Sequence, residues 1–355
     1  MAARGAAGAE PQGAVRALVM SDVAALAGVS HQTVSRVING HPNVAQHTRE
    51  RVEAAIAELG YRPNVAARAL VTGSTRTIGL VTIKINQYGP AQTMLGLEHA
   101  ARAAGYSVAV SILDDATADA VREAVDTFVA QRVDAILALG TYDDAAAALA
   151  ELHPPVPLVA VQVGGHEDRP AVGVDQEEGA RQATRHLLEL GHRTVHHVAG
   201  PLDSQEARGR IDGWRSELAR VGAPEPELLK GDWTPSSGYA AGRRLARRFR
   251  DGEDVTAAFL GNDQMALGLL AALHEEGIEV PRDVSVVGFD DLPEAPYFTP
   301  PLTTVRQDFA ELGRRGVQLV LARLRGEDLH PEAVPAPLVV RSSTGPARDP
   351  EPGPA

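Results

Sequence analysis

Short apolar runs alternate with longer amphipathic stretches over most of the chain, and this alternation constrains the fold more than any other feature. The runs are TIGLVTI, YSVAVSIL, DAILAL, PLVAVQV, TVHHVAG, VTAAFLGND and VSVVGFDD. Most are apolar on both faces, as are strands buried in a parallel sheet. Alanine-rich stretches such as AQTMLGLEHAARAAG lie between them and end in glycine, as capped helices do. Alternation over about 260 residues predicts an α/β body of two lobes with doubly wound parallel sheets.

Shorter segments flank this body. The first is rich in Ala and Gly and the last in Pro. We expect a disordered extension over 1–18, an all-α head over 19–62, a linker over 63–76, the body over 77–341 and a disordered tail over 342–355.

Composition excludes several classes of protein. The chain has no cysteine, so it can form neither a disulfide, nor a thiolate metal site, nor a cysteine nucleophile. No run approaches the roughly 18 apolar residues of a membrane span. The start, MAARGAAGAEPQGAVRALVM, lacks the apolar core of a signal peptide. We therefore expect a cytoplasmic protein that is not attached to a membrane.

Charge is distributed unevenly along the chain. The whole chain carries −12, but residues 1–76 hold eight arginines against five acidic residues, which gives +3 and leaves −15 on the remainder. Phosphates would repel an acidic body, so any contact with nucleic acid has to come from the head. A chance fluctuation would give the same numbers, and charge alone does not separate the two interpretations.

The head carries the pattern of a helix–turn–helix. The stretch SDVAALAGVSHQTVSRVINGH, residues 21–41, predicts two short helices joined by a turn at Gly28, with Ser30 capping the second. A third helix should follow, with Val52, Ala55, Ile56 and Leu59 on its buried face. The residues of the first two helices that should face the core are Val23, Leu26, Ala27, Val34, Val37 and Ile38.

The second helix leaves a polar stripe outside. His31, Gln32, Ser35 and Arg36 do not face the predicted core. Gln can pair with adenine through two hydrogen bonds and Arg with guanine, so this stripe could read bases in the major groove. An ordinary solvated face of a small helical domain would show the same periodicity.

Motifs for catalysis and metal binding are weak in the body. The phosphate-binding, dinucleotide-binding, zinc-protease and nucleophile-elbow motifs are all absent. His196 and His197 lie near His192, but neighbours on a strand face opposite sides, so we expect no metal site. Asp290 and Asp291 end a strand, where they could serve an acid–base enzyme or cap a strand–loop junction.

Longer strings carry a specific resemblance. SDVAALAGVSHQTVSRVING, VAQHTRERVEAAIAELGYRPNVAARAL, ELGHRTVHHVAGPLDSQEARGRIDGW, GNDQMALGLL and DVSVVGFDDLPEAPYFTPPLTTVRQDF resemble the LacI/GalR transcriptional repressors. The resemblance spans residues 20 to about 341. It implies a helix–turn–helix head on a body of the periplasmic-binding-protein type. It also implies a homodimeric repressor of sugar-utilisation genes that binds double-stranded operator DNA and is released by a saccharide. One departure is Ala45, which starts a helix where Ser is usual.

By this resemblance, specific residues should contact DNA. His31, Gln32 and Arg36 match the base readers, and Ser35 lies on the same stripe. Residues 64–70 match a hinge helix whose Leu70 wedges into the minor groove. A helix this short is unstable alone and should form only against its twin and DNA. The remaining implied contacts are Ser30, Thr33, Asn39, Thr48, Tyr61, Asn64 and Ala67.

The resemblance also implies an effector pocket between the lobes. Arg208, Asn262 and Asp290 match ligands of a sugar, and Trp233 and Phe309 match its flanking aromatics. The further residues expected to line the same cleft are Gln162, Ser204 and Gln307.

The pocket residues of the C-terminal lobe are galactoside-like, whereas Leu139 and Gln162 depart from that pattern in the N-terminal lobe. The resemblance implies a galactoside-like saccharide as effector, with no cofactor, no metal and no catalysis. Trp233 could instead belong to the core, and Arg208 could be a surface residue. A sugar-binding protein of the periplasmic type, without a regulatory role, and a catalytic α/β enzyme are the alternatives.

Overall fold

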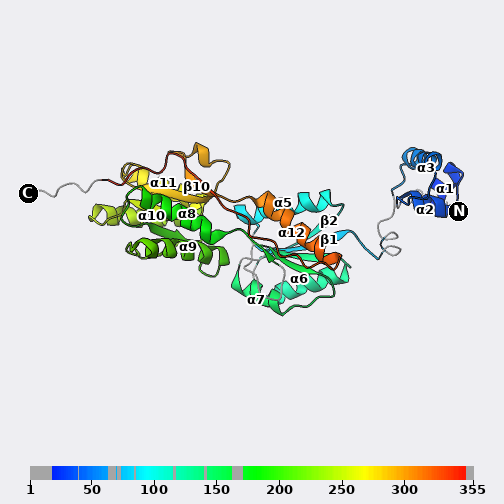
Figure 1. Ribbon diagram of the computed structural model, residues 1–355, viewed down its shortest axis with the longest axis horizontal. Helices are drawn as coiled ribbons and strands as arrows, with labels where there is room; N and C mark the ends of the chain where they lie inside the picture. The colour runs from blue at the N-terminus through cyan, green and yellow to red at the C-terminus, as the bar shows by residue number, and fades with distance from the viewer. Residues whose placement is uncertain are drawn as a thin grey trace, which may run out of the picture. The chain divides into compact units, whose positions relative to one another are not determined.

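The computed structural model describes residues 18–38, 40–62, 69, 73–83, 85–114, 117–139, 142–161 and 171–348 (Figure 1). The chain forms two compact units that divide between Thr75 and Arg76. This division lies one residue before the predicted start of the body. Within the described ranges, no helix is both long enough and apolar enough to cross a bilayer.

The first unit contains three helices, α1 (Met20–Ala27), α2 (His31–Ile38) and α3 (Gln46–Leu59). Gly28 ends α1 with a left-handed φ of +61°, which a side chain would disfavour. Arg51 of α3 donates from Nη2 to the carbonyl oxygens of Ala27 and Gly28, at 2.6 and 3.2 Å. The end of α1 is thereby satisfied, and the predicted helix–turn–helix is confirmed.

The core of this unit is formed as expected with one exception. Val23, Val34 and Val52 are completely buried, one from each helix. Leu26 was predicted to join them but is 45% exposed, and Ala24 is buried instead. The prediction was wrong because a helix of 8 residues with several apolar positions does not fix its own rotation against its neighbours.

The two later helices of the head start differently. Ser30 Oγ accepts a hydrogen bond from Thr33 N at 3.2 Å and caps α2, as predicted. Ala45 starts α3 and provides no side-chain acceptor. A missing cap of this kind costs about 0.5–2 kcal/mol of stability.

The second unit begins with a parallel five-stranded sheet of order β2-β1-β3-β4-β5. Helices α5 (Tyr88–Ala103) and α12 (Phe309–Leu324) cover one face, and α6 (Ala118–Ala130) and α7 (Asp143–Glu151) cover the other (Figure 1). The edge strand β2 is partly exposed, unlike its neighbours. The strands are β1 (Thr77–Ile83), β2 (Ser107–Leu113), β3 (Ala135–Leu139), β4 (Leu158–Val161) and β5 (Ala171–Val172).

A second sheet, of order β11-β10-β9-β8-β6-β7, forms the other lobe. Its strands are parallel except β11, which pairs antiparallel with β10. The strands are β6 (His196–Ala199), β7 (Leu229–Lys230), β8 (Ala257–Leu260), β9 (Ser285–Asp290), β10 (Thr303–Arg306) and β11 (Leu338–Val339).

Helices cover both faces of the second sheet as well. The pair α8 (Gln176–Glu189) and α9 (Gln205–Val221) packs together, as does the pair α10 (Pro235–Arg250) and α11 (Asp263–Glu275). A single 3₁₀ turn, η1 (Ala295–Tyr297), follows β9. Both lobes are therefore doubly wound α/β layers, which confirms the predicted fold class.

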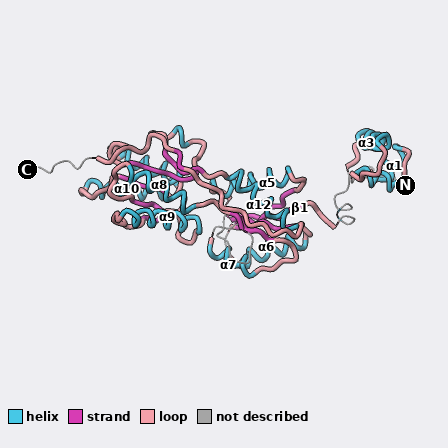
Figure 2. The backbone as a smooth tube through the Cα atoms, in the orientation of Figure 1, coloured by secondary structure: helices cyan, strands magenta, loops and turns pink. Residues whose placement is uncertain are grey.

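Three segments of chain connect the two lobes, at 173–175, 307–308 and 325–337 (Figure 2). The first and third lie side by side, since Asp175 N donates to Val334 O at 2.9 Å and Val334 N donates to Gly173 O at 2.8 Å. We call these segments the crossovers.

The C-terminal segment is more ordered than its composition predicts. Ser343 is completely buried, donates from Oγ to Val286 O at 2.6 Å and accepts from Thr303 N at 2.8 Å. His192 Nε2 lies 3.1 Å from Gly345 O. The expected disordered tail over 342–355 was therefore wrong for 342–348, because the Ser343 hydroxyl and backbone groups such as Ala347 N, which donates to Leu190 O at 2.9 Å, bond this segment to the second lobe. Residues 349–355 lie outside the described part.

Candidate DNA interface and ligand pocket

Helix α2 presents the predicted polar face. His31, Gln32 and Arg36 are exposed, whereas Val34 and Val37 point into the core. An amide and a guanidinium therefore share the exposed side of a helix that is short enough to lie in a major groove. This face can form hydrogen bonds with base edges.

The other expected DNA contacts are distributed less evenly. Ser30 is exposed, Thr33 and Ser35 are half-buried, and half-buried Thr48 has its Oγ1 3.1 Å from His47 Nε2. Tyr61 is only 7% exposed and also belongs to the core of the head. The predicted contacts that lie outside the described residues are Asn39, Asn64, Ala67 and Leu70.

A pocket open to solvent lies within the second unit, beyond the carboxyl ends of strands from both sheets, and its walls border about 320 Å³ of space, open solvent included. This is where open α/β sheets bind ligands. A short segment after β1 contributes the wall from the first lobe, and helix α9, the end of β9 and the loops after β7, β8 and β10 contribute the rest. The lining residues are Gln87, Tyr88, Gly89, Pro90, Glu206, Arg210, Trp233, Asn262, Asp290 and Gln307.

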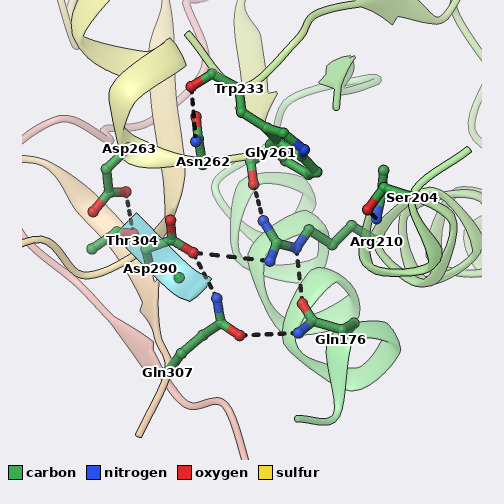
Figure 3. Close-up of polar contacts among 12 residues, drawn as sticks. Gln176, Ser204, Arg210, Trp233, Gly261, Asn262, Asp263, Asp290, Thr304 and Gln307 are labelled. Atoms are coloured by element: carbon green, nitrogen blue, oxygen red, sulfur yellow. Dashed lines mark hydrogen bonds and ion pairs between the residues drawn. The ribbon is translucent and has the colours of Figure 1, made fainter. Parts of the chain in front are cut away.

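Arg210 is the central cation of this pocket (Figure 3). It is 2% exposed, and its guanidinium lies 3.9 Å from the centre of the Phe289 ring. Its Nη1 donates to Gly261 O, and its Nη2 lies 3.9 Å from Asp290 Oδ1. Burial lowers the pKa of Arg210, while Asp290 opposes this effect.

Two carboxyl groups in the pocket have raised pKa values. Burial raises the pKa of Asp290 to about 6, although Arg210 and a hydrogen bond from Gln307 act in the opposite direction. Burial also raises the pKa of Glu206 to about 7, again against the effect of Arg210. Perturbed carboxyl groups that meet in a cavity are typical of functional sites.

Trp233 forms an aromatic wall. Its backbone has a φ of +73°, and that of Asp290 is +115°, conformations that residues other than glycine rarely adopt. The indole packs against Gly200 so closely that a Cβ there would lie 2.2 Å from the ring. Asn262 caps α11 through Met265 N and donates from Nδ2 to the Trp233 carbonyl at 3.1 Å. Trp233 therefore belongs to the pocket as well as to the core.

The sequence prediction placed Arg208 among the ligand contacts, and the structure corrects this. Arg208 is not among the residues that line the pocket. It donates to Asp143 Oδ2 at 2.6 Å and to Leu202 O at 3.1 Å, and 40% of its side chain is exposed. Arg210 takes the predicted place. The reason is helical geometry, because residues two positions apart lie on nearly opposite sides of α9.

Other predicted residues lie at or behind the pocket wall. Asn262, Asp290, Trp233 and Gln307 line it as expected. Ser204 is completely buried and caps α9. Phe309 lies one layer back, with its ring centre 5.7 Å from that of Tyr88. Leu139 is buried in β3, and Gln162 lies outside the described residues.

Several pocket residues were not predicted from the sequence. Gln87 and Tyr88 come from the first lobe, where no strand-end motif marks them. Glu206 could have been found, because it lies in the first turn of the helix that follows β6, in the same string that contains Arg210.

The histidines bond separate neighbours. His197 is completely buried, stacks on Phe259 with ring centres 4.6 Å apart, and has its pKa lowered by burial to about 4. His196 Nε2 lies 3.1 Å from Asp254 O instead. Among the described residues, no group of three or more potential metal ligands occurs.

Comparison with known proteins decides the family. Residues 19–64 match the model described as bacterial regulatory proteins, lacI family, and residues 184–344 match a periplasmic binding protein-like domain. The lactose operon repressor of Escherichia coli (strain K12) is 36% identical over 332 residues, which cover 93% of this chain and 91% of that protein. The chain belongs to the lacI family of bacterial regulatory proteins.

Other lacI-family proteins are also similar over most of their length. The HTH-type transcriptional regulator CelR of Thermobifida fusca is 39% identical over 321 residues, covering 87% of this chain and 92% of that protein. The crystal structure of the lac repressor dimer bound to operator and the anti-inducer ONPF matches with a TM-score of 0.84 at 36% identity, covering 93% and 100% of the two chains. A CelR–cellobiose complex matches with a TM-score of 0.67 at 35% identity, covering 92% and 99%.

Family membership fixes the role of the two units. The head is the DNA-binding domain of a lacI-family transcriptional regulator, and the body is of the periplasmic-binding-protein type, as the resemblance implied. The alternative of a sugar-binding protein without a regulatory role does not account for the head. Neither matched model describes an enzyme.

Proposed function

We propose that this regulator is a dimeric repressor of sugar-utilisation genes whose effector is a neutral, galactoside-like saccharide. The observation that carries the proposal is the set of groups that converge in the pocket: Arg210, Asp290 and Trp233. Carboxylates accept hydrogen bonds from sugar hydroxyls, a guanidinium donates to sugar oxygens, and an indole covers the apolar face of a pyranose.

The details of Asp290 support a hydroxyl-bearing ligand. Its Oδ1 accepts from Gln307 Nε2 at 2.6 Å, whereas its Oδ2 makes no hydrogen bond with the residues that the structure describes. This oxygen is thus available to a ligand. Asp290 and Glu206 also give the pocket more acidic than basic groups, which disfavours phosphorylated or carboxylated ligands.

A binding experiment tests the proposal directly. DNA duplexes selected from a random library with the purified protein define an operator, and mobility shifts are then measured with and without sugars. Calorimetry with lactose, galactose, cellobiose and galactose 6-phosphate ranks the ligands. We expect a galactoside to bind most tightly and to weaken operator binding. Preference for cellobiose or for the phosphate would contradict the galactoside assignment.

Arg36→Ala tests the recognition helix. We expect a loss of about 1–3 kcal/mol in operator binding, together with relaxed preference at one position of each half-site, because an arginine that reads guanine contributes this much. Thr48→Ala should weaken binding to all sequences about equally, as loss of a phosphate contact does. Repeating the selection with each variant measures both effects, and an unchanged base preference in Arg36→Ala would reject the assignment.

The dimer rests on exposed apolar side chains. Ile112 on β2, Leu267 on α11 and Tyr297 in η1 are 52%, 46% and 84% exposed. We propose that the dimer interface covers these three side chains and so removes their apolar surface from water. We expect the 37.4 kDa chain to sediment as a dimer at micromolar concentration, and Leu267→Asp to shift it toward the monomer. Val221→Asp is the control that should stay dimeric, because Val221 is similarly exposed but lies at the end of α9, which carries none of the three proposed interface residues.

A further inference from the structure

Four side chains form one hydrogen-bonded chain that starts and ends in the pocket (Figure 3). Arg210 Nε donates to Gln176 Oε1 at 2.8 Å, and Gln176 Nε2 donates to Gln307 Oε1 at 2.9 Å. Gln307 Nε2 in turn donates to Asp290 Oδ1 at 2.6 Å. Gln176 does not line the pocket, unlike the other three. We call this set of four residues the amide relay.

The direction of the amide relay is fixed by its two ends. A guanidinium only donates and an ionised carboxylate only accepts. Each glutamine must therefore turn its carbonyl oxygen toward Arg210 and its amide nitrogen toward Asp290. If the Gln176 amide were reversed, its Nε2 would face Arg210 Nε, donor against donor, and its Oε1 would face Gln307 Oε1, acceptor against acceptor. Bonds aligned in series between a cation and an anion also strengthen one another.

The two glutamines lie where the chain passes between the lobes. Gln176 begins α8 directly after the crossover at 173–175, and Gln307 belongs to the crossover between β10 and α12. Helix α9 approaches Gln176 closely, since a Cβ on Gly209 would lie 3.0 Å from the Gln176 Cβ. The bond between the two amides therefore joins the start of α8, next to one crossover, to a second crossover, and the two glutamines are 131 positions apart in the sequence.

We propose that Gln176 is a positioning residue that couples ligand binding in the pocket to the relative orientation of the two lobes. A ligand that hydrogen-bonds to Arg210 or Asp290 uses groups that belong to the amide relay. The relay includes one residue of the crossover at 307–308 and the first residue of α8, directly after the crossover at 173–175. A ligand can shift the lobes only through bonds whose strength differs between the two orientations. The amide relay provides such bonds. This inference rests on the proposed function, because it assumes that the pocket holds the effector.

Gln176→Glu separates the two bonds that Gln176 makes. A carboxylate still accepts from Arg210 but can no longer donate to Gln307 Oε1. Gln176→Met removes both bonds without adding charge. The matched control is Gln182→Glu on the same helix. Gln182 Oε1 accepts from Leu338 N at 3.3 Å, a bond that a carboxylate can still accept, and within the described ranges its Nε2 donates no hydrogen bond.

The first measurement is the ratio of operator Kd with saturating lactose to operator Kd without it, repeated with cellobiose. We expect both Gln176 variants to reduce this ratio at least fivefold, and Gln182→Glu to stay within twofold of the parent. A residue that only stabilised the fold would alter the melting temperature and leave the ratio unchanged.

The second measurement needs no sugar. The chain has no cysteine, so spin labels on Arg102→Cys in α5 and Arg247→Cys in α10 report the distance between the lobes in electron double resonance. An excess of unlabelled protein is mixed in, so that most dimers contain one labelled subunit and only distances within a subunit are measured. We expect Gln176→Glu to broaden the distance distribution of the sugar-free protein, and Gln182→Glu to leave it unchanged.

The outcomes separate the two proposals. An unchanged distance distribution together with an unchanged Kd ratio in the Gln176 variants would overturn the amide relay. A parent protein whose operator affinity ignores both sugars would contradict the proposed effector, and the distance measurement would then decide on the amide relay alone.

Discussion

Arg210→Met should abolish measurable sugar binding and lower the free energy of unfolding by about 3–5 kcal/mol near neutral pH. Methionine keeps much of the side-chain volume, so the effect reports on charge and hydrogen bonding more than on packing. The substitution leaves Gln176 Oε1, Gly261 O and Asp290 without their buried donor or cation. Removing one partner of a buried charge pair costs more than the pair itself contributes, because the other charge stays desolvated. Urea denaturation and calorimetry measure the two effects.

The neighbouring arginine provides the control. Arg208 lies on the same helix, but its ion pair with Asp143 is solvent-exposed on both sides. Exposed pairs contribute about 0–1 kcal/mol, so Arg208→Met should change stability little. In the Arg210→Met variant the loss of unfolding free energy should be smaller in acid, because a protonated Asp290 is neutral and is no longer an unpaired buried charge. Equal losses in the two variants would contradict the assignment of Arg210 to the pocket.

Glu206→Gln should make the protein more stable at pH 8, by up to about 3 kcal/mol, and equally stable below pH 4.5. Burial raises the pKa of Glu206 from 4.5 to about 7, so the folded protein binds this proton more tightly than the unfolded chain. The contribution to stability is fully present below pH 4.5 and is lost as the pH rises through 7. Because glutamine does not titrate, the stability of the Glu206→Gln variant does not fall as the pH rises through 7. Urea denaturation at several pH values measures the difference.

A control with the opposite sign is available. Hydrogen bonds from Arg314 and Arg315 lower the pKa of Glu311 to about 2. Glu311→Gln should therefore be less stable than the parent at neutral pH, and the difference should vanish as the pH falls through 4.5 toward 2. A stability difference for Glu206→Gln that is the same at every pH would show that its carboxyl does not titrate as the structure indicates.

The sequence predicted the fold well because buried parallel strands must be apolar on both faces. All seven apolar runs correspond to strands of the structure. The strands β5, β7 and β11 were not predicted, because each has two residues and shows no period. Strand β10 was not predicted either, since its buried Thr303 and Thr304 carry hydroxyl groups where an apolar run was sought.

The pocket could be predicted only in part. Asn262 closely follows β8 and Asp290 ends β9, two strands whose positions the pattern fixes, so their meeting at one sheet edge could be foreseen. Gln307 follows β10, which the pattern did not predict, so only the family resemblance indicated it. Arg208 was preferred to Arg210 because the rotation of a helix relative to a cleft depends on packing partners that the sequence does not reveal. The amide of Gln176 acquires its role from Gln307, which is 131 positions away.

The two tryptophans of the chain lie in different surroundings, which gives the protein an optical signal of its own. Trp214 is completely buried, with its Nε1 bonded to Val195 O at 2.8 Å, whereas Trp233 forms a wall of the pocket. Emission from Trp214 should form a constant background, while emission from Trp233 responds to whatever fills the cavity. Because the DNA-binding head contains no tryptophan, a change in intrinsic fluorescence reports on the lobes without interference from the operator.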